Sequence, residues 1–323
     1  MKWVDINKGY EVNKEYRSRL LAKEIKMDKR CDLFAATPPL EAKKMLFSMA
    51  VTEGIGYLAG HPVEGMKIDF IDISKAYFQA DAIREVYVQL PDEDWKEGRC
   101  GRVLTSMYGN RDAAKKWGAA YCEFMKSVGF QQGKASPCVF WHKEKEIRCV
   151  VHGDDLTVLG WGNQVDWLWK KIKTKCLSKH RSRLGPEPSD LKSIRILNRI
   201  VEWGSEGILY EGDQRHVEIC LQEMGIEESS REVTTPCDKS LDDKKNSHAL
   251  RAGEEEEEKL ASSAATSYRG MTARMNYLGQ DRSEIQFAIK ELSKDMSSPT
   301  VRSWGKLMSL LNSLIANWIS LLS

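Results

Sequence analysis

The sequence has no long uninterrupted apolar run and no cysteine pattern that builds a metal or disulfide module. Its eight cysteines include no C-x-x-C pair and no Cys/His spacing of a zinc site, so we expect reduced thiols in an intracellular protein. No basic stretch followed by an apolar one comes after Met1, so no secretory signal peptide is predicted. The apolar segment 307–322 is short and interrupted by Asn312 and Asn317, which favours a packed or interfacial helix over a membrane span.

The sequence also lacks internal repeats and the strict strand–helix alternation of a doubly wound parallel sheet. Its expected elements instead favour a mixed α+β fold with antiparallel strands and helices. With 323 residues, 41% of them hydrophobic and 30% charged, the chain suits a soluble globular protein with one large core or two modest ones.

The formal net charge of +2 hides a strong segregation of charge along the chain. Residues 170–199 contain ten Lys and Arg against two Asp and Glu, whereas residues 200–258 contain six against seventeen. A concentrated basic stretch in a chain of balanced charge points to an anionic partner, nucleic acid first. A solvated, lysine-rich helix face is the ordinary alternative.

Hydrophobic periodicity predicts most of the secondary structure. Helical spacing occurs in 39–53 and, most clearly, in 112–128. Residues 66–80 open as a strand and should become helical after Ser74, a suitable N-cap, while 84–91 alternates like a strand. Further expected elements are a helix at 163–177, two strands within 193–211, a helix from Asp213 to Met224 ended by Gly225, a polar linker over Thr234–Lys259 and two or three helices beyond it.

The stretch "EIRCVVHGDDLTVLGW" (146–161) sets two carboxylates between two apolar runs. The runs can pair as antiparallel strands joined by a two-residue Gly153–Asp154 turn, with Gly first as a type II′ turn prefers. This geometry would present Asp154 and Asp155 at the tip of a hairpin. Gly and Asp are also ordinary turn formers, so the pair taken alone favours a purely structural turn.

A third carboxylate, Asp72, ends the apolar strand "IDFIDI", and Asp69 should point to the opposite face of that strand. If this strand lies beside the hairpin, Asp72, Asp154 and Asp155 converge at one edge of the sheet. Carboxylates that close repel one another, and hard divalent cations relieve the repulsion. Two Mg²⁺ ions about 4 Å apart in such a site stabilise the attacking and leaving oxygens of an in-line phosphoryl transfer.

Several segments resemble copia-type retrotransposon reverse transcriptases, in the order found in that family. They are "DISKAYFQADAIREVYVQLP" (72–91), "RVLTSMYGNRDAAKKWGAAYCEFMKSVGFQQGKASPCVFW" (102–141), and "HGDD" (152–155) at the place of the family's Tyr-x-Asp-Asp. "YRSRLLAKE" (16–24) and "YRGMTARMNYLGQDRSEIQFAIKELSKDMSSPT" (268–300) are similar to flanking family segments. The resemblance extends over nearly the whole chain.

The resemblance implies a right-hand polymerase fold of fingers, palm and thumb, with an antiparallel palm sheet followed by a helical C-terminal segment. It implies an RNA-directed DNA polymerase that extends a primer on an RNA or DNA template with deoxynucleoside triphosphates. The implied divisions are fingers over 1–65, palm with an inserted fingers segment over 66–185, the end of the palm and a thumb-like segment over 186–235, an acidic flexible linker over 236–265, and a helical connection-like segment over 266–323 without ribonuclease H.

The same resemblance assigns roles to individual residues. Asp72, Asp154 and Asp155 match the catalytic carboxylates that hold two Mg²⁺, or Mn²⁺, and the backbone carbonyl of Ile73 would help to hold one metal. Tyr77 matches an aromatic whose ring crowds the 2′ position of the sugar and rejects ribonucleotides. A core aromatic on a first helical turn is the plain interpretation of Tyr77.

The resemblance also implies that several basic residues contact the nucleotide and the nucleic acid. Arg17 and Arg19 match positions that grip triphosphate oxygens, where solvated surface arginines are the alternative. Arg111 matches a basic position near the incoming nucleotide or template, and residues 170–199 would bind backbone phosphates. Trp117 is expected to pack in the core of its helix and not to stack on a base.

The chain also departs from the family pattern. His152 and Gly153 replace the Tyr and an apolar residue before the aspartate pair, and Asp112 brings a carboxylate where an amide is usual. We therefore carry a second hypothesis, a catalytically impaired retrotransposon remnant that binds nucleic acid without polymerising, and a weaker third, another two-metal phosphoryl-transfer enzyme. The expected location is intracellular, either in a cytoplasmic virus-like particle or in the nucleus, with no membrane partner.

Overall fold

The computed structural model describes residues 1–7, 14–26, 29, 33–61, 64–213, 215–226 and 258–322, with side chains as far as Ile315. The chain splits into two compact units. The first comprises 1–194 and 202–208, and the second comprises 195–201 and 209–323. The predicted mixed fold with antiparallel sheets and helices is confirmed.

The centre of the first unit is a six-stranded antiparallel sheet. The chain order of its strands differs from their order in space, which is β10-β3-β9-β8-β7-β6. β3 therefore lies beside β9, which joins the apolar 66–73 segment to the predicted hairpin. The strands are β3 (Lys67–Ile73), β6 (Gln131–Gln132), β7 (Val139–His142), β8 (Ile147–His152), β9 (Asp155–Gly160) and β10 (Ser178–Leu184).

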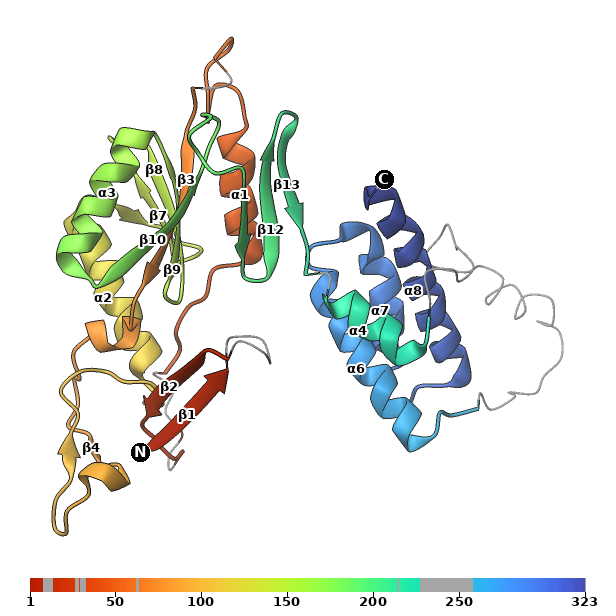
Figure 1. Ribbon diagram of the computed structural model, residues 1–323, viewed down its shortest axis with the longest axis horizontal. Helices are drawn as coiled ribbons and strands as arrows, with labels where there is room; N and C mark the ends of the chain where they lie inside the picture. Colours follow the sequence, from red (N-terminus) through yellow and green to blue (C-terminus); the bar gives the residue numbers. More distant parts are fainter. Residues whose placement is uncertain are drawn as a thin grey trace. The chain divides into compact units, whose positions relative to one another are not determined.

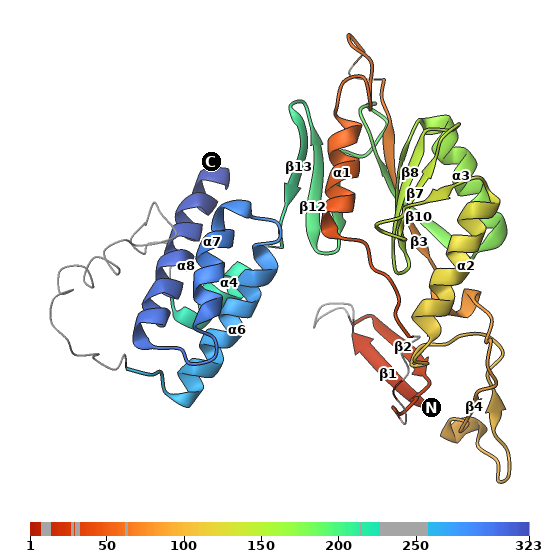
Figure 2. The same cartoon turned by 180° about the vertical axis from the view of Figure 1, so that it is seen from behind.

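Helices cover both faces of this sheet. Figures 1 and 2 show α2 (Ala113–Ser127) and α3 (Gly162–Lys175) on one face and α1 (Leu40–Ala50) on the other. Side chains of a strand alternate between faces, so β3 sends Ile71 and Ile73 to the α2/α3 face. There they join a core of buried side chains that includes Trp117, Met125, Phe140, Cys149, Val151, Leu156, Val158, Val165, Leu168 and Ile172.

The predicted helices 39–53, 112–128 and 163–177 are confirmed as α1, α2 and α3, to within a few residues at their ends. The helix predicted after Ser74 is shorter and differently capped than expected. It is a single 3-10 turn, η1 (Ala76–Gln79), preceded by Lys75 in the left-handed backbone region at φ 54°. The serine therefore does not act as the N-cap.

Smaller elements flank the sheet. β1 (Lys2–Asn7) and β2 (Tyr16–Leu21) form an antiparallel pair, and the predicted 84–91 strand is only the two-residue β4 (Tyr87–Val88), paired with β5 (Gly101–Arg102). The 193–211 segment forms three strands where two were expected: β11 (Ser193–Ile196), β12 (Arg199–Gly204) and β13 (Gly207–Glu211). The additional turn is at Leu197–Asn198, both at positive φ as a type I′ hairpin requires.

The second unit has a helical core. α4 (Arg215–Met224), α6 (Ser262–Leu278), α7 (Gln286–Lys294) and α8 (Val301–Leu322) bury an apolar cluster. The Tyr268 hydroxyl lies inside it and donates to the Leu292 carbonyl at 2.8 Å. Beside this cluster, Arg199 pairs with the fully buried Asp281 at 2.7 Å. Buried cluster members include Met271, Met275, Leu307, Leu310, Leu311 and Leu314.

The C-terminal apolar segment is a packed helix, as predicted, because α8 buries one face in this cluster. Among the described helices, none combines the length and apolarity needed to cross a bilayer. Most of the predicted acidic linker falls on residues 227–257, which lie outside the described residues. Its last residues, from Ser262, already belong to α6.

Candidate active site

The hairpin of β8 and β9 has the predicted turn. His152 and Asp155 are directly opposed in the strand register, which leaves Gly153 and Asp154 as the two central residues. Gly153 has φ 65°, and Asp154 is not among the residues with positive φ, which fits a type II′ turn and excludes type I′. The indole Nε1 of Trp117, which is buried in α2, donates to the Gly153 carbonyl at 2.7 Å and holds the turn.

Asp72 lies directly across from Asp155 in the antiparallel register of β3 and β9. Residues opposed in this way project to the same face of a sheet. The Asp154 carbonyl accepts a hydrogen bond from the Ile73 amide at 2.8 Å, which extends the pairing into the turn. The predicted convergence of the two segments at one end of the sheet is thus present in the structure.

Asp69 faces the other side of the sheet, as strand alternation predicts. Its carboxylate is fully buried and accepts from Arg183 Nε at 2.6 Å and Nη2 at 2.8 Å. The His180 Nε2 atom lies 2.7 Å from the same carboxylate. Asp69 is therefore a satisfied structural carboxylate and does not belong to the Asp72–Asp155 site.

Arg181 bridges the two opposed carboxylates, which the sequence alone does not indicate. Its Nη2 lies 2.7 Å from Asp72 Oδ1, and its Nη1 lies 3.5 Å from Asp155 Oδ1. The strand register of β10 shifts between His180 and Ser182, so Arg181 is the extra residue of a β-bulge. Because the preceding His180 faces Asp69, strand alternation turns Arg181 to the opposite face, where its guanidinium meets the carboxylates.

The pKa of Asp155 reflects this crowding of charge. Burial raises the pKa of its carboxyl above the ordinary value, and the neighbouring Asp154 and Asp72 raise it further. The Arg181 guanidinium and the Lys43 ammonium act in the opposite direction. Lys43 comes from α1, the helix on the same face of the sheet, and is buried. The raised pKa of Asp155 therefore arises first from burial and then from its two acidic neighbours, with two cations acting against it.

The residues present have the chemistry of a divalent-cation site, because hard cations such as Mg²⁺ prefer carboxylate oxygens. Asp72 and Asp155 already share one cationic group, the Arg181 guanidinium. Within the described part of the chain, however, no three His, Cys, Asp or Glu side chains are grouped closely enough to hold a metal ion. Asp72 and Asp155 lie close together, and the cationic group that pairs with both of them is the Arg181 guanidinium.

Tyr108 connects the other predicted site residues to this edge. Its ring lies 4.9 Å from the Tyr77 ring and 5.8 Å from the Phe78 ring, between centroids. The Arg19 guanidinium lies over it at 5.2 Å. Burial raises the pKa of Tyr108, Arg19 opposes that shift, and Asp154 adds to it. Tyr77, Arg19 and Asp154 therefore surround one tyrosine.

Arg17 belongs to the same cluster by its electrostatic effect on Tyr108. Arg17 lies two residues before Arg19 on β2, so the two side chains project to the same face of the β1–β2 pair. The end of this strand is attached to the unit at Ala22, whose amide donates to the Tyr108 carbonyl at 2.8 Å. The arginines predicted to grip a triphosphate are thus placed beside the tyrosine cluster.

Arg111 is placed near this attachment through its backbone. Its amide donates to Glu24 Oε2 at 2.9 Å, and the same oxygen accepts from Arg84 Nη2 at 2.6 Å. Arg84 also pairs with Asp112 at 2.8 Å, and Asp112 with Lys116 at 3.0 Å. Asp112, the departure from the family pattern, is therefore a buried member of a structural ion network.

Three side chains of the site were not predicted from the sequence: Arg181, Tyr108 and Lys43. Tyr108 had a usable signal, since it precedes Gly109 inside the "SMYGNRDAA" block. Lys43 had a weak one, a lysine among the apolar residues of an amphipathic helix. Arg181 had none, because its position depends on the pairing of β10 with β3, which no local pattern announces.

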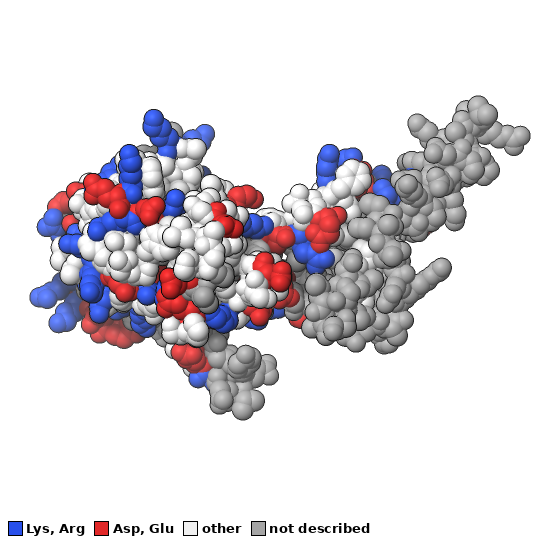
Figure 3. Space-filling model, turned by 90° about the horizontal axis from the view of Figure 1, so that it is seen from above, with Lys and Arg blue, Asp and Glu red and all other residues white. Residues whose placement is uncertain are grey.

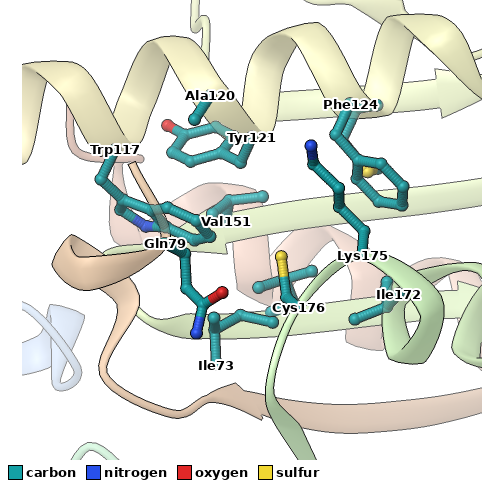
Figure 4. A pocket seen from close by; sticks show the side chains of 12 residues that line it. Ile73, Gln79, Trp117, Ala120, Tyr121, Phe124, Val151, Ile172, Lys175 and Cys176 are labelled. Atoms are coloured by element: carbon teal, nitrogen blue, oxygen red, sulfur yellow. The ribbon is translucent and has the colours of Figure 1, made fainter. Parts of the chain in front are cut away.

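An apolar pocket lies on the opposite face of the sheet from the carboxylates. Figure 4 shows Trp117, Tyr121 and Phe124 of α2 above Ile73 and Val151 of the sheet. Because Ile73 follows Asp72 on the strand, its side chain points away from the carboxylate face. This pocket is the space between α2, α3 and the sheet, and it supports the turn from behind without adding to the site.

The predicted basic stretch, residues 170–199, is distributed over α3, β10 and the following segment, and part of its charge is neutralised locally. Arg183 pairs with Asp69 and Asp166. On the face that Figure 3 shows, Lys and Arg groups are interspersed with Asp and Glu groups.

Comparison with known proteins gives two results. Residues 1–183 match the family model described as reverse transcriptase (RNA-dependent DNA polymerase). The chain is also similar to the retrovirus-related Pol polyprotein from transposon TNT 1-94 of Nicotiana tabacum, with 22% identity over 154 residues. That alignment covers 45% of this chain and 11% of the polyprotein, so the chain spans only a small part of its relative.

Proposed function

Because this chain belongs to the reverse transcriptase (RNA-dependent DNA polymerase) family, we propose that it extends a primer on an RNA or DNA template by nucleotidyl transfer. One observation carries the proposal: Asp72 and Asp155 are directly opposed at the end of two paired strands, beside the tight turn that holds Asp154. Three carboxylates at one end of a sheet, with an arginine-bearing strand pair near them, are suited to a nucleoside triphosphate and its metal ions.

The reaction places the primer 3′-hydroxyl against the α-phosphorus of the incoming deoxynucleoside triphosphate. A new oxygen–phosphorus bond forms, the bond from the α-phosphorus to the bridging oxygen breaks, pyrophosphate leaves, and the hydroxyl proton passes to solvent. Asp72, Asp154 and Asp155 would hold Mg²⁺ or Mn²⁺, which supplies charge neutralisation at the attacking and leaving oxygens. The protein contributes mainly by positioning these groups.

Other residues of the site orient the nucleotide. Arg17 and Arg19 project to one face of β2 and would bind the triphosphate oxygens, to which a guanidinium fork is suited. Tyr77, held by its contact with Tyr108, would place its ring against C2′ of the sugar and exclude a 2′-hydroxyl by steric clash. Arg111 would lie near the nucleotide or the template.

The proposal extends to the arrangement of the chain. The six-stranded sheet with its helices would be the palm, the β1–β2 pair part of the fingers, and the segment after β10 the end of the palm and a thumb-like element. The helices after residue 258 would form a connection-like segment. The protein would act inside the cell, in a virus-like particle or in the nucleus.

A primer-extension assay on an RNA template tests this function. The unmutated chain should add deoxynucleotides with Mg²⁺ or Mn²⁺. Asp154→Asn should lower the rate by at least about 100-fold because it removes a charge on which the transition state depends. Asp94→Asn, an equivalent change in an exposed 3-10 turn (Asp92–Asp94), should leave it unchanged. If the chain binds primer–template yet adds no nucleotide with either metal, the binding-only alternative replaces the enzyme.

A further inference from the structure

The Arg181 guanidinium lies where a cation between Asp72 and Asp155 would lie. Its two terminal nitrogens each approach a different carboxylate, at 2.7 Å and 3.5 Å. The three side chains differ in exposure: Arg181 is 50% exposed, whereas Asp72 and Asp155 are 19% and 27% exposed. The carboxylates are thus held in the sheet, while the arginine reaches them from the solvent side.

The backbone explains why the arginine reaches this place. β10 is the edge strand beside β3, and Lys179 is the residue in register with Asp72. Strand alternation places Arg181, two residues later, on the same face as Lys179 and Asp72, whereas His180 faces Asp69. The register shift after His180 leaves Arg181 with no opposite residue on β3.

The charged groups around the site come from several elements of the fold. Asp72 comes from β3, and Asp154 and Asp155 come from the hairpin turn and β9. The cations that face Asp155 are Arg181 from β10 and Lys43 from α1. Lys43 is buried in its helix, and so it stays as a fixed charge, whereas Arg181 has a long, half-exposed side chain that can move into solvent.

We propose that Arg181 is the built-in counter-cation of the metal-free site, and that a divalent cation binds Asp72 and Asp155 only when the guanidinium leaves them. This inference rests on the proposed function, since it concerns the metal of that same site. Arg181 then has two opposite effects. It stabilises the clustered carboxylates in the absence of metal, and it raises the metal concentration that the site requires.

Metal binding to the chain alone tests this inference without relying on catalysis. Mn²⁺ binding is measured by electron paramagnetic resonance, and Mg²⁺ binding by calorimetry, with no nucleic acid or nucleotide present. Arg181→Gln should bind both ions about 5- to 10-fold more tightly than the unmutated chain, because no internal cation competes. Arg181→Lys should lie between the two, since an ammonium cannot bridge two carboxylates as a guanidinium fork does.

The matched control is Lys171→Gln, which removes one positive charge from α3, on the opposite face of the sheet from the carboxylates. Lys171 is exposed and its replacement should change metal affinity by less than about 2-fold, because a solvated charge there acts only through screened, long-range attraction. Equal tightening in Lys171→Gln and Arg181→Gln would reduce the effect to general electrostatics and overturn the proposal.

Thermal unfolding provides a second, independent measurement. Without metal, Arg181→Gln should unfold at a lower temperature than Lys171→Gln, because the carboxylates lose their counter-cation. Saturating Mg²⁺ should remove most of this difference, since a bound ion stabilises the native state. An Arg181→Gln variant that is equally stable with and without metal contradicts the proposal.

The two proposals fail in different ways. If the chain extends primers but Arg181→Gln does not tighten metal binding, the counter-cation role is wrong and the polymerase function stands. If Arg181→Gln binds metal and the unmutated chain does not, the counter-cation role is supported, and the arginine prevents metal binding in the unmutated chain. If neither form binds metal and no primer is extended, both proposals are wrong.

Discussion

The indole Nε1 of Trp117 donates a hydrogen bond to the carbonyl oxygen of Gly153 across 36 positions of sequence, at 2.7 Å. One end of this contact is a buried core residue of α2, and the other is the turn that carries Asp154. A residue that packs in the core therefore also sets the position of a candidate catalytic carboxylate. The placement of the turn depends on helix packing as well as on the turn residues themselves.

Trp117→Phe should lower both stability and primer extension. Loss of the hydrogen bond and of part of the buried ring should reduce the free energy of unfolding by about 2 kcal/mol, measured by urea denaturation. The rate of primer extension should fall as well, because the turn loses its anchor. Trp169→Phe in α3 provides the same change away from the turn. If both variants lose activity equally, the contact has no special role in positioning Asp154.

Replacing Gly153 tests the backbone of the same turn. Gly153 has φ 65°, and a Cβ there would meet no atom within 4 Å, so Gly153→Ala has only a backbone cost. We expect a loss of about 1 kcal/mol in unfolding free energy. Gly118→Ala is the control with the opposite sign. It lies in α2, where a Cβ would touch only Tyr121 at 4.0 Å, and alanine should stabilise the helix by up to about 1 kcal/mol. A neutral or stabilising Gly153→Ala would show that the turn is not held in this conformation in solution.

Tyr77→Ala should raise the incorporation of ribonucleotides relative to deoxynucleotides. The side chain that would crowd the 2′ position is then absent, so the discrimination should fall by at least about 10-fold. The measurement is the ratio of kcat/KM for matched ribo- and deoxynucleoside triphosphates. Phe78→Ala, the adjacent aromatic that also contacts Tyr108, should leave that ratio nearly unchanged. If the kcat/KM ratio is the same in Tyr77→Ala as in the unmutated chain, the Tyr77 ring only packs and does not select the sugar.

The Asp112 network predicts a loss of stability in acid. Burial alone would raise the pKa of Asp112, but hydrogen bonds from Arg84 and Lys116 outweigh it and lower the pKa to about 2. Because the folded value lies below the ordinary 3.8, the carboxylate stabilises the fold fully above about pH 4, and this contribution disappears as the pH falls toward 2.

Urea unfolding between pH 7 and pH 2 measures this effect. At pH 7, Asp112→Asn should lower the free energy of unfolding by about 2 kcal/mol, and the difference from the unmutated chain should shrink steadily below pH 4. Glu97→Gln, a change at an exposed position, should follow the unmutated chain at every pH. A difference that is the same at pH 7 and pH 2 would mean that Asp112 contributes through shape and not through charge.

Local rules were sufficient for the parts of the site that depend on neighbours in sequence. Period-two alternation predicts that Asp69 and Asp72 face opposite sides of one strand, and the Gly153–Asp154 pair predicts the turn. Both are present in the structure because strand alternation and the φ preference of glycine act over a few residues. The same rules missed the third strand of 193–211, since its turn uses Leu197 and Asn198 at positive φ in place of a glycine.

What only the tertiary structure decided is how distant segments meet. Arg181 reaches Asp72 from 109 residues away because β10 pairs with β3, and Arg19 lies over Tyr108 because Ala22 is hydrogen-bonded to the backbone of that tyrosine. Such contacts depend on strand order, register and helix packing, which arise from the burial of the whole core and leave no local signal. The sequence determined which carboxylates could act together; the fold decided which cation lies between them.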